Sequence, residues 1–235
     1  MKVLTWNSAM RFRDKIEEVL PLQPDLMIIP ECEAPEKWNN QPRLQSLNQF
    51  LWYGENKNKG LGIISLNQNL RLQLHSLYND AFRFIVPITV TGEEEFILFA
   101  IWAQNAPKKF DSYIGQIYMA LQYYKELLRE PCILAGDWNS NKVFDYIRRV
   151  GTHTDVVTYL KYFNIHSTYH YFYKEEHGLE TTPTYFFRKE SEKPFHLDYI
   201  FASTDFLQRI KRMDIGSSQD WISISDHFPI TLEIE

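Results

Sequence analysis

The chain has 235 residues, of which 44% are hydrophobic and 15% aromatic, and its formal net charge is −5 at pH 7. This length and composition are typical of a globular protein with a substantial core, and they predict one domain over residues 1–235. We expect no membrane span, because no apolar run reaches about 18 residues. The negative net charge argues against strong nonspecific binding of nucleic acid through bulk charge, although it is compatible with a local basic groove.

The first two predicted strands bring polar side chains to one edge of a sheet. Residues 3–7 alternate as a strand that ends in Asn7, and residues 11–20 have the pattern of an amphipathic helix. Residues 25–31 form a short apolar run that ends in Glu31, typical of a buried strand. Because a strand–helix–strand crossover makes its strands neighbours, Asn7 and Glu31 should lie close together. Taken alone, Asn7 is equally typical of a turn or a helix cap.

The middle of the chain is predicted to form a meander. The expected strands are residues 61–66, 71–77, 82–90 and 95–102. A short helix is expected near residues 42–49. The turn at residues 57–62 carries a small basic cluster, for which we favour a solvated hairpin over a phosphate contact. Consecutive hairpins, one of them at Gly92, imply an antiparallel sheet, on which a helix at residues 111–128 should pack.

A carboxylate and a carboxamide follow the buried strand predicted before residue 136. The segment reads Gly136-Asp137-Trp138-Asn139-Ser140-Asn141. Because residues two apart in an extended chain point to the same side, Asp137 and Asn139 can face one ligand. Chemistry gathers at the carboxyl ends of strands in α/β proteins. An Asx turn that leaves the strand explains the same segment equally well.

The last third of the chain is predicted to supply three more polar residues. It begins with short helices at residues 143–150 and 154–162 and a long aromatic functional loop at residues 166–195. In the strand expected at residues 196–202, Asp198 should be shielded from water, which is costly unless a cation or a donor meets it. Asp226 and His227 precede a final strand at residues 230–234. Because they are adjacent, a loop or bulge must hold them if both serve one site.

These strand-end residues share oxygen or imidazole donors, and no cysteine cluster accompanies them. They are Asn7, Glu31, Asp137, Asn139, Asp198, Asp226 and His227. Such a set favours a hard divalent cation, Mg²⁺ or Mn²⁺, over structural zinc. One histidine among several carboxylates suits attack of water on a phosphate ester, in which a metal neutralises phosphate charge and a carboxylate activates the water.

The order of these motifs resembles that of the endonuclease/exonuclease/phosphatase superfamily over essentially the whole chain. The matching motifs are Thr5-Trp6-Asn7, Pro30-Glu31, Gly136-Asp137-Trp138-Asn139-Ser140, Leu197-Asp198-Tyr199-Ile200 and Ser225-Asp226-His227-Phe228-Pro229-Ile230. The resemblance implies an α/β sandwich of two facing, mixed, mainly antiparallel sheets flanked by helices. It also implies a metal-dependent phosphoesterase with one or two Mg²⁺ or Mn²⁺ ions.

The same resemblance implies roles for the metal-side residues. Glu31 matches the main metal ligand, with Asn7 beside it and Asp226 as a second carboxylate on the metal side. The family often places a Tyr or a His that helps to bind phosphate shortly after residue 100. This chain has Trp102 and Asn105 there, and we expect these two to take over substrate binding.

Roles for the catalytic residues follow in the same way. Asp137 matches the group that orients or activates the attacking water, and Asn139 matches its phosphate-binding neighbour. His227 matches the residue that contacts the scissile phosphate, held by Asp198. This pairing is physically reasonable, because a carboxylate fixes the ring tautomer and favours the protonated ring.

The substrate class stays open between a nuclease, which we favour, and an inositol-phosphate or other small-phosphoester phosphatase. A catalytically silent binding module on the same fold is the alternative from a different class. The aromatic residues of the long loop could stack on bases, although packing onto the core is the commoner outcome. Cys32 and Cys132 adjoin predicted core strands and should be free buried thiols, and no signal peptide is recognisable. We therefore expect a cytoplasmic monomer without a membrane partner.

Overall fold

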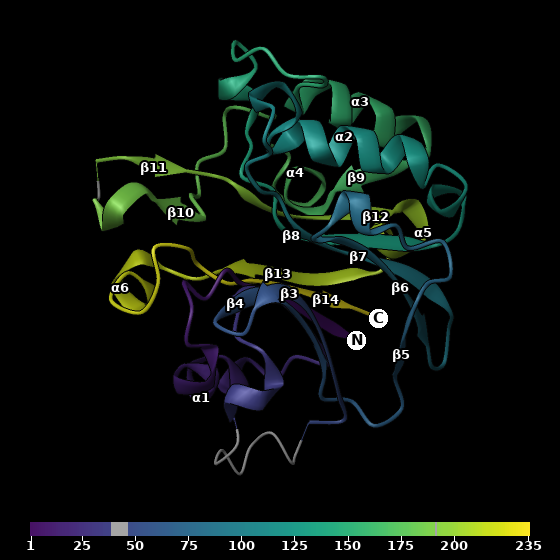
Figure 1. Cartoon of the computed structure of the whole chain (residues 1–235), viewed down its shortest axis with the longest axis vertical. Helices are drawn as coiled ribbons and strands as arrows, with labels where there is room; N and C mark the ends of the chain where they lie inside the picture. Colours follow the sequence, from purple (N-terminus) through teal and green to yellow (C-terminus); the bar gives the residue numbers. More distant parts are fainter. Residues whose placement is uncertain (39–46, 191) are drawn as a thin grey trace.

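Two six-stranded sheets face each other, with helices on their outer sides (Figure 1). The computed structural model describes residues 1–38, 47–190 and 192–235. The two chain ends lie side by side, and the amino group of Met1 donates to the carbonyl oxygen of Ile234 at 2.7 Å. The α/β sandwich expected from the sequence is therefore confirmed.

The first sheet carries the N-terminal and C-terminal strands at its centre. Its order is β13 (Ile210–Ile215), β14 (Ile230–Ile234), β1 (Lys2–Thr5), β2 (Leu26–Cys32), β4 (Lys59–Ser65) and β3 (Gln49–Asn56). β1 and β2 run parallel, as the crossover predicted, and the other neighbours are antiparallel. The helix expected between β1 and β2 is instead three short pieces, because Lys15 leaves helical geometry with φ −121°. These pieces are η1 (Phe12–Asp14), α1 (Ile16–Val19) and η2 (Leu20–Leu22).

The second sheet contains three of the four strands of the predicted meander. The first, expected at residues 61–66, is β4, and it lies in the other sheet because it pairs with β2 and β3. Its order is β5 (Arg71–Leu74), β6 (Ile85–Thr91), β7 (Phe96–Trp102), β8 (Cys132–Asp137), β12 (Asp198–Ser203) and β9 (Ile165–Ser167). β5, β6 and β7 pair antiparallel, and β7 pairs parallel with β8. The crossover helix α2 (Ile114–Tyr123) lies with α3 (His153–Tyr162) over the outer face of this sheet (Figure 1).

Smaller elements complete the described chain. The helices are α4 (Thr168–Tyr173), α5 (Thr204–Leu207) and α6 (Ser218–Trp221), and β10 (Tyr185–Phe186) pairs with β11 (Pro194–Phe195). The 3-10 turns are η3 (Pro35–Trp38), η5 (Asp80–Phe82), η6 (Lys109–Asp111), η7 (Leu127–Arg129), η8 (Lys142–Phe144) and η9 (Phe187–Lys189). Among the described residues, no helix has the length and apolar character needed to cross a bilayer.

The apolar residues form one core between the sheets and further cores under the outer helices. On β12, Ile200 and Ala202 belong to the core between the sheets, whereas Tyr199 and Phe201 pack under α2 and α3. A strand that is apolar on both faces must lie inside a layered fold. Because neighbouring residues of β12 point to opposite faces, this strand can serve two different polar clusters.

Several sequence expectations need correction. The expected loop at residues 166–195 contains α4 and the β10–β11 pair, and the expected helix at 143–150 is a single turn that ends at Phe144. The expected helix near 42–49 falls largely outside the described residues, and β3 begins at Gln49. β13, α5 and α6 were not predicted. The expectation of free, buried cysteines is confirmed for Cys32 and Cys132.

Candidate active site

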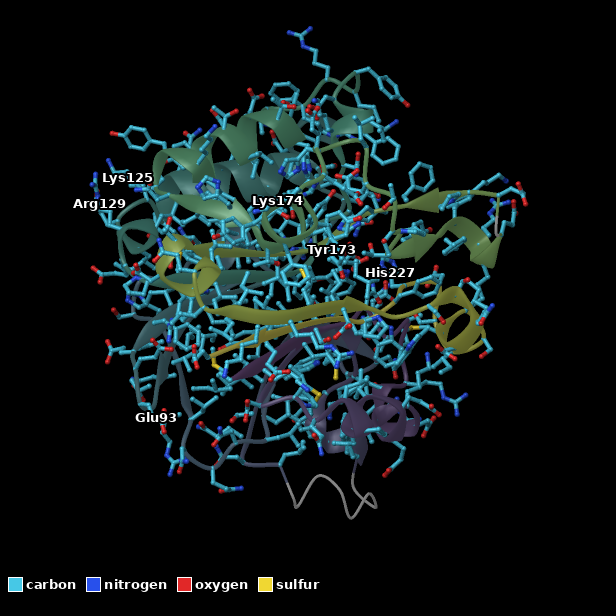
Figure 2. The ribbon with its side chains drawn as sticks, turned by 180° about the vertical axis from the view of Figure 1, so that it is seen from behind. Glu93, Lys125, Arg129, Tyr173, Lys174 and His227 are labelled. Atoms are coloured by element: carbon cyan, nitrogen blue, oxygen red, sulfur yellow. The ribbon has the colours of Figure 1, made fainter. Side chains whose placement is uncertain are left out.

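Four segments that lie far apart in the sequence bring polar side chains together at one edge of the sandwich. Asn7 follows β1, Asp137 ends β8 and Asp198 begins β12. Because β8 and β12 are antiparallel, the end of one faces the start of the other, and Asp137 lies opposite Asp198. His227 comes from the loop before β14, and Figure 2 shows it between the C-terminal strand and the β10–β11 ribbon.

Two carboxamides hold one oxygen of Asp137, and a backbone N–H holds the other. Asn7 Nδ2 donates to Asp137 Oδ2 at 2.9 Å, and Asn139 Nδ2 donates to the same oxygen at 3.0 Å. The backbone N–H of Asn139 donates to Asp137 Oδ1 at 2.9 Å, which requires a tight turn with φ 47° at Asn139. Asparagine tolerates this left-handed conformation better than most residues. Asp137 and Asn139 therefore meet through the Asx turn that was the alternative interpretation of this segment, and not through an extended chain, because Asn139 has left-handed geometry.

A glycine is required where this segment leaves its strand. Gly136 has φ 149°, and a Cβ atom there would lie 1.8 Å from the carbonyl oxygen of Ile101 on the neighbouring strand. Any side chain at this position would therefore displace Asp137 from the carboxamides.

A buried carboxylate orients the catalytic candidate His227. Its Nδ1 lies 2.9 Å and 3.1 Å from the two oxygens of Asp198. Thr184 is fully buried, and its hydroxyl donates to Asp198 Oδ2 at 2.7 Å. The same hydroxyl oxygen accepts hydrogen bonds from the backbone N–H groups of Leu197 and Asp198. With Nδ1 fixed in this way, the opposite ring nitrogen, Nε2, faces Asp137 Oδ2 at 4.0 Å.

Burial and neighbouring charges shift the pKa values of this cluster. Burial raises the pKa of Asp137 well above its ordinary value, against the opposing effect of the His227 cation. Burial also acts to lower the pKa of His227, but Asp198 and Asp137 outweigh it and raise that pKa. A carboxyl group whose pKa moves towards neutrality next to an imidazolium is a pair suited to acid–base chemistry.

The metal-side candidates lie beside this cluster. Glu31 occupies a bulge in β2 with φ 62°, and its Oε1 pairs with the Lys59 ammonium at 2.9 Å. Lys59 also lies 5.1 Å above the centre of the Trp102 ring. The turn before β4 is the expected hairpin, yet Lys59 is not merely solvated. It pairs with a site carboxylate that the sequence gave no reason to connect with it.

Tyr185 links the metal-side and catalytic groups. Its ring packs on that of His227 at a centroid distance of 4.5 Å. Burial and four nearby carboxylates raise the pKa of the Tyr185 hydroxyl to about 12. These carboxylates are Asp226, Asp137, Asp198 and Glu31. All four acidic candidates therefore act on one point at the edge of the sandwich.

The first and last segments are joined by hydrogen bonds to the backbone. Trp6 Nε1 donates to the carbonyl oxygen of His227 at 2.9 Å, and Ser225 Oγ donates to that of Asn7 at 2.8 Å. Asp226 and His227 lie in a loop, as adjacent site residues require. Sequence reasoning missed Thr184, and it considered Tyr185 as one of several loop aromatics that could stack on bases. No periodic pattern marks their segment.

The two expected substrate contacts lie in different environments. Trp102 is 3% exposed and packs on Phe84 at a ring distance of 4.9 Å. Asn105 is exposed beyond the end of β7. Of these two, Asn105 is the side chain that a ligand can reach directly.

The donors on the metal side fit a hard cation. Glu31 Oε1 already binds a cation, the Lys59 ammonium. Asn7 Oδ1 accepts one hydrogen bond, from the N–H of Ala9, and an amide oxygen has a second lone pair. Asp137, Asp198 and His227 also place ligand atoms close together, but the His227–Asp198 hydrogen bonds engage those atoms. Glu31 and Asn7 thus offer oxygen atoms suited to a hard cation, and Lys59 occupies Glu31.

Comparison with known proteins agrees with this geometry. The Endonuclease/Exonuclease/phosphatase family model matches residues 4–227. No curated protein sequence matches the chain significantly. Three solved structures illustrate what the fold is similar to, with identities too low to establish more than the fold.

The 3′-5′ exonuclease NExo from Neisseria meningitidis is 17% identical with a TM-score of 0.69, covering 100% of both chains. The endonuclease domain of TRAS1, a telomere-specific non-LTR retrotransposon, is 16% identical with a TM-score of 0.68, covering 100% of this chain and 97% of that one. An AP endonuclease from Archaeoglobus fulgidus is 16% identical with a TM-score of 0.67, covering 100% of this chain and 99% of that one.

Proposed function

Since the chain belongs to the endonuclease/exonuclease/phosphatase family, we propose that it is a divalent-metal-dependent nuclease that hydrolyses phosphodiester bonds. One observation carries this proposal. Asn7, Asp137 and His227, from three distant segments, meet with Asp198 in one buried, hydrogen-bonded cluster. Buried charges are costly, and such a cluster is typical of a site that uses them.

Asp137 is proposed to orient the attacking water and to take its proton. Burial raises the pKa of this carboxyl group, which makes it a stronger base than an exposed aspartate. Asn7 and Asn139 hold its oxygens in place. In this proposal Asn139 also contacts the phosphate.

His227 is proposed to stabilise negative charge on the phosphoryl oxygens. Asp198 holds Nδ1, so Nε2 is the nitrogen that can donate towards a substrate. The raised pKa of His227 keeps the ring cationic at neutral pH. A fixed donor next to developing charge is worth a few kcal/mol of barrier.

Glu31, Asn7 and Asp226 are proposed to hold Mg²⁺ or Mn²⁺. The bound ion would neutralise phosphate charge and lower the pKa of water. Lys59 is the group that must release Glu31 for this to occur. In this proposal the Trp102 ring positions Lys59 through a cation–π contact, and Asn105 contacts the substrate.

DNA is the proposed substrate. One structure of NExo from Neisseria, described as a 3′ phosphatase, contains a product DNA hairpin, with 17% identity and a TM-score of 0.68 to this chain. The AP endonuclease and the TRAS1 domain are both named as endonucleases. A shared fold supports this assignment by analogy.

The test is an assay of the full chain with Mg²⁺, and separately with Mn²⁺, on four substrates. These are abasic-site duplex, supercoiled plasmid, single-stranded RNA and inositol phosphates. We expect cleavage of a DNA substrate that EDTA abolishes. Glu31→Gln should raise the Mg²⁺ concentration needed for half-maximal rate. Asp214→Asn, a matched change at an exposed ion pair with Arg212, should behave as wild type.

Two results would overturn the proposal. Turnover of inositol phosphates alone would replace the nuclease with a small-phosphoester phosphatase. No turnover of any substrate with either metal would indicate a silent binding module.

A further inference from the structure

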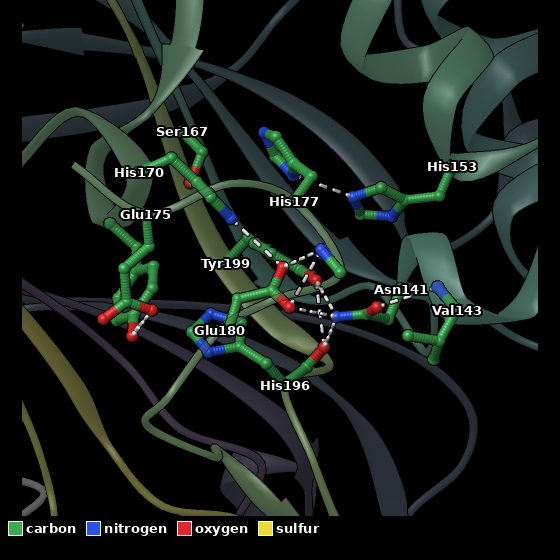
Figure 3. A network of polar contacts seen from close by, with 12 residues as sticks. Asn141, Val143, His153, Ser167, His170, Glu175, His177, Glu180, His196 and Tyr199 are labelled. Carbon is green, nitrogen blue, oxygen red and sulfur yellow. Dashed lines mark hydrogen bonds and ion pairs between the residues drawn. The ribbon is translucent and has the colours of Figure 1, made fainter. Parts of the chain in front are cut away.

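A second polar cluster lies on the opposite face of β12 from Asp198. It gathers four of the chain's seven histidines around one carboxylate, Glu180 (Figure 3). The four are His153, His170, His177 and His196. The Tyr199 ring, next to Asp198 in the strand, contacts three of them. None of the four takes part in the catalytic cluster, and we call this group the histidine cluster.

Three donor groups of the histidine cluster have the spacing of metal ligands. Ligand atoms of His170, His177 and Glu180 all lie within 4.8 Å of one another. The closest described pair is His170 Nε2 and Glu180 Oε1, at 3.0 Å. Two ligands on a tetrahedral zinc ion, each about 2.0–2.1 Å from the metal, lie roughly 3.3 Å apart. The His170–Glu180 pair therefore already has nearly the separation of two ligands of one ion.

Neighbouring groups orient each of the three donors. Ser167 Oγ lies 2.7 Å from His170 Nδ1, which leaves Nε2 to face Glu180. His153 Nε2 lies 3.3 Å from His177 Nδ1. Asn141 Nδ2 and the N–H of Gly178 donate to the Glu180 carboxylate, each at 3.0 Å (Figure 3). Hydrogen bonds that fix the far nitrogen of a ligating histidine are characteristic of metal sites.

A pocket gives access to this cluster from solvent. Its volume is about 300 Å³, and His170 and His177 line it together with His166 and Lys161. An open side next to these two histidines leaves room for water as a fourth ligand. A path of entry is a further requirement of a metal site.

From this geometry we propose that His170, His177 and Glu180 bind one zinc ion, with water completing the shell. Two imidazoles and one carboxylate suit a borderline ion such as Zn²⁺ better than Mg²⁺, which prefers oxygen donors alone. In the bound form the neutral His170 ring carries its one proton on Nδ1, which donates to Ser167 Oγ, so that Nε2 offers its lone pair to the metal in place of its contact with Glu180. The His170 and His177 rings, stacked at 3.5 Å, must splay to point both nitrogens at the ion.

The test measures metal binding by the full chain after removal of bound metal with EDTA. Zn²⁺ is titrated against a chromophoric chelator, and Co²⁺ binding is followed by the visible absorption of a four-coordinate site. We expect one equivalent of Zn²⁺ that Mg²⁺ does not displace. His177→Ala and Glu180→Gln should each weaken binding by more than ~100-fold, because loss of a ligand exceeds the effect of losing an orienting group. His75→Ala, a histidine outside the cluster, should leave binding unchanged.

Three results would overturn the proposal. Wild-type protein could bind no Zn²⁺, or His177→Ala could bind it as tightly as wild type. Binding could also be lost with Glu31→Gln instead, which would place the ion at the catalytic cluster. If Glu180→Gln fails to fold by circular dichroism, the histidine ring NMR signals of wild type decide, because Zn²⁺ must shift those of His170 and His177 and not that of His227.

Discussion

The two polar clusters on either face of β12 use the same residue types in opposite proportions. In the catalytic cluster, Asp198 and Asp137 flank one histidine and raise the pKa of His227 to about 10, although burial opposes them. In the histidine cluster, burial lowers the pKa of His153 to about 4 and of His177 to about 3, although Glu180 acts against it. The carboxylates beside His227 thus outweigh burial, whereas those near His153 and His177 do not.

This difference in charge separates two kinds of chemistry. A cationic ring can donate to a phosphoryl oxygen, whereas a neutral ring can offer a lone pair to a metal. One segment, residues 136–141, supports both clusters. Asn139 holds Asp137 on one side, and Asn141 holds Glu180 on the other. The comparison predicts that the clusters can be altered one at a time.

The largest expected effect is on catalysis. Asp137→Asn should lower kcat on the cleaved substrate by about 10³-fold, because a general base typically contributes ~10²–10⁴-fold. Zn²⁺ affinity should stay unchanged, since Asp137 lies on the other face of the sheet. Steady-state kinetics and the zinc titration measure the two quantities. Equal losses in both would show that the clusters are not separate.

The two clusters should make the free energy of unfolding depend on pH in different ways. Each contribution should amount to a few kcal/mol, at about 1.4 kcal/mol per pKa unit. The raised pKa of His227 contributes stability that is complete below its ordinary value of 6.5 and is lost as pH rises through about 10. The lowered pKa of His153 contributes stability that is present above 6.5 and is lost as pH falls through about 4.

Thermal unfolding of metal-free protein across this pH range provides the measurement. His227→Gln should flatten the alkaline limb of the Tm profile, and His153→Gln should flatten the acid limb. If both variants flatten the same limb, the contrast in protonation is wrong.

A smaller effect is expected from the residue that supports the catalytic carboxylate. Thr184→Val removes the hydrogen bond to Asp198 and leaves two buried backbone N–H groups without their acceptor. This change should lower the free energy of unfolding by about 1–3 kcal/mol, and it should lower kcat roughly 10-fold with little change in KM. Thr184→Ser should restore kcat, whereas an unchanged kcat in Thr184→Val would remove Thr184 from the positioning of His227.

The smallest expected effect is the coupling between the clusters. The changes in unfolding free energy caused by Asp137→Asn and His177→Ala should add within ~0.5 kcal/mol, as they do for sites without shared partners. Urea unfolding of both single variants and the double variant tests this. A larger deviation would mean that residues 136–141 transmit strain between the two faces.

Much of the catalytic cluster was predictable because local rules apply to it. Period-two alternation and apolar runs located the strands, and a polar residue after a buried strand has few places to point except the sheet edge. Asn7 and Asp137 follow this rule, and the structure brings them together with Asp198 and His227. Lys59 and Thr184 obey no such rule, because their partners Glu31 and Asp198 lie 28 and 14 positions away along the chain.

The sequence by itself determined the antiparallel order of β5, β6 and β7, the parallel β1–β2 pair and the residue types available at the strand ends, whereas packing of the layers placed β4 in the other sheet. The tertiary structure alone decided the histidine cluster. Its members come from α3, from α4, from the segment after α4 and from the residues just before β12, with no periodicity to connect them. Side-chain period and strand length are local properties that a sequence displays, whereas the meeting of distant rings depends on how whole layers pack.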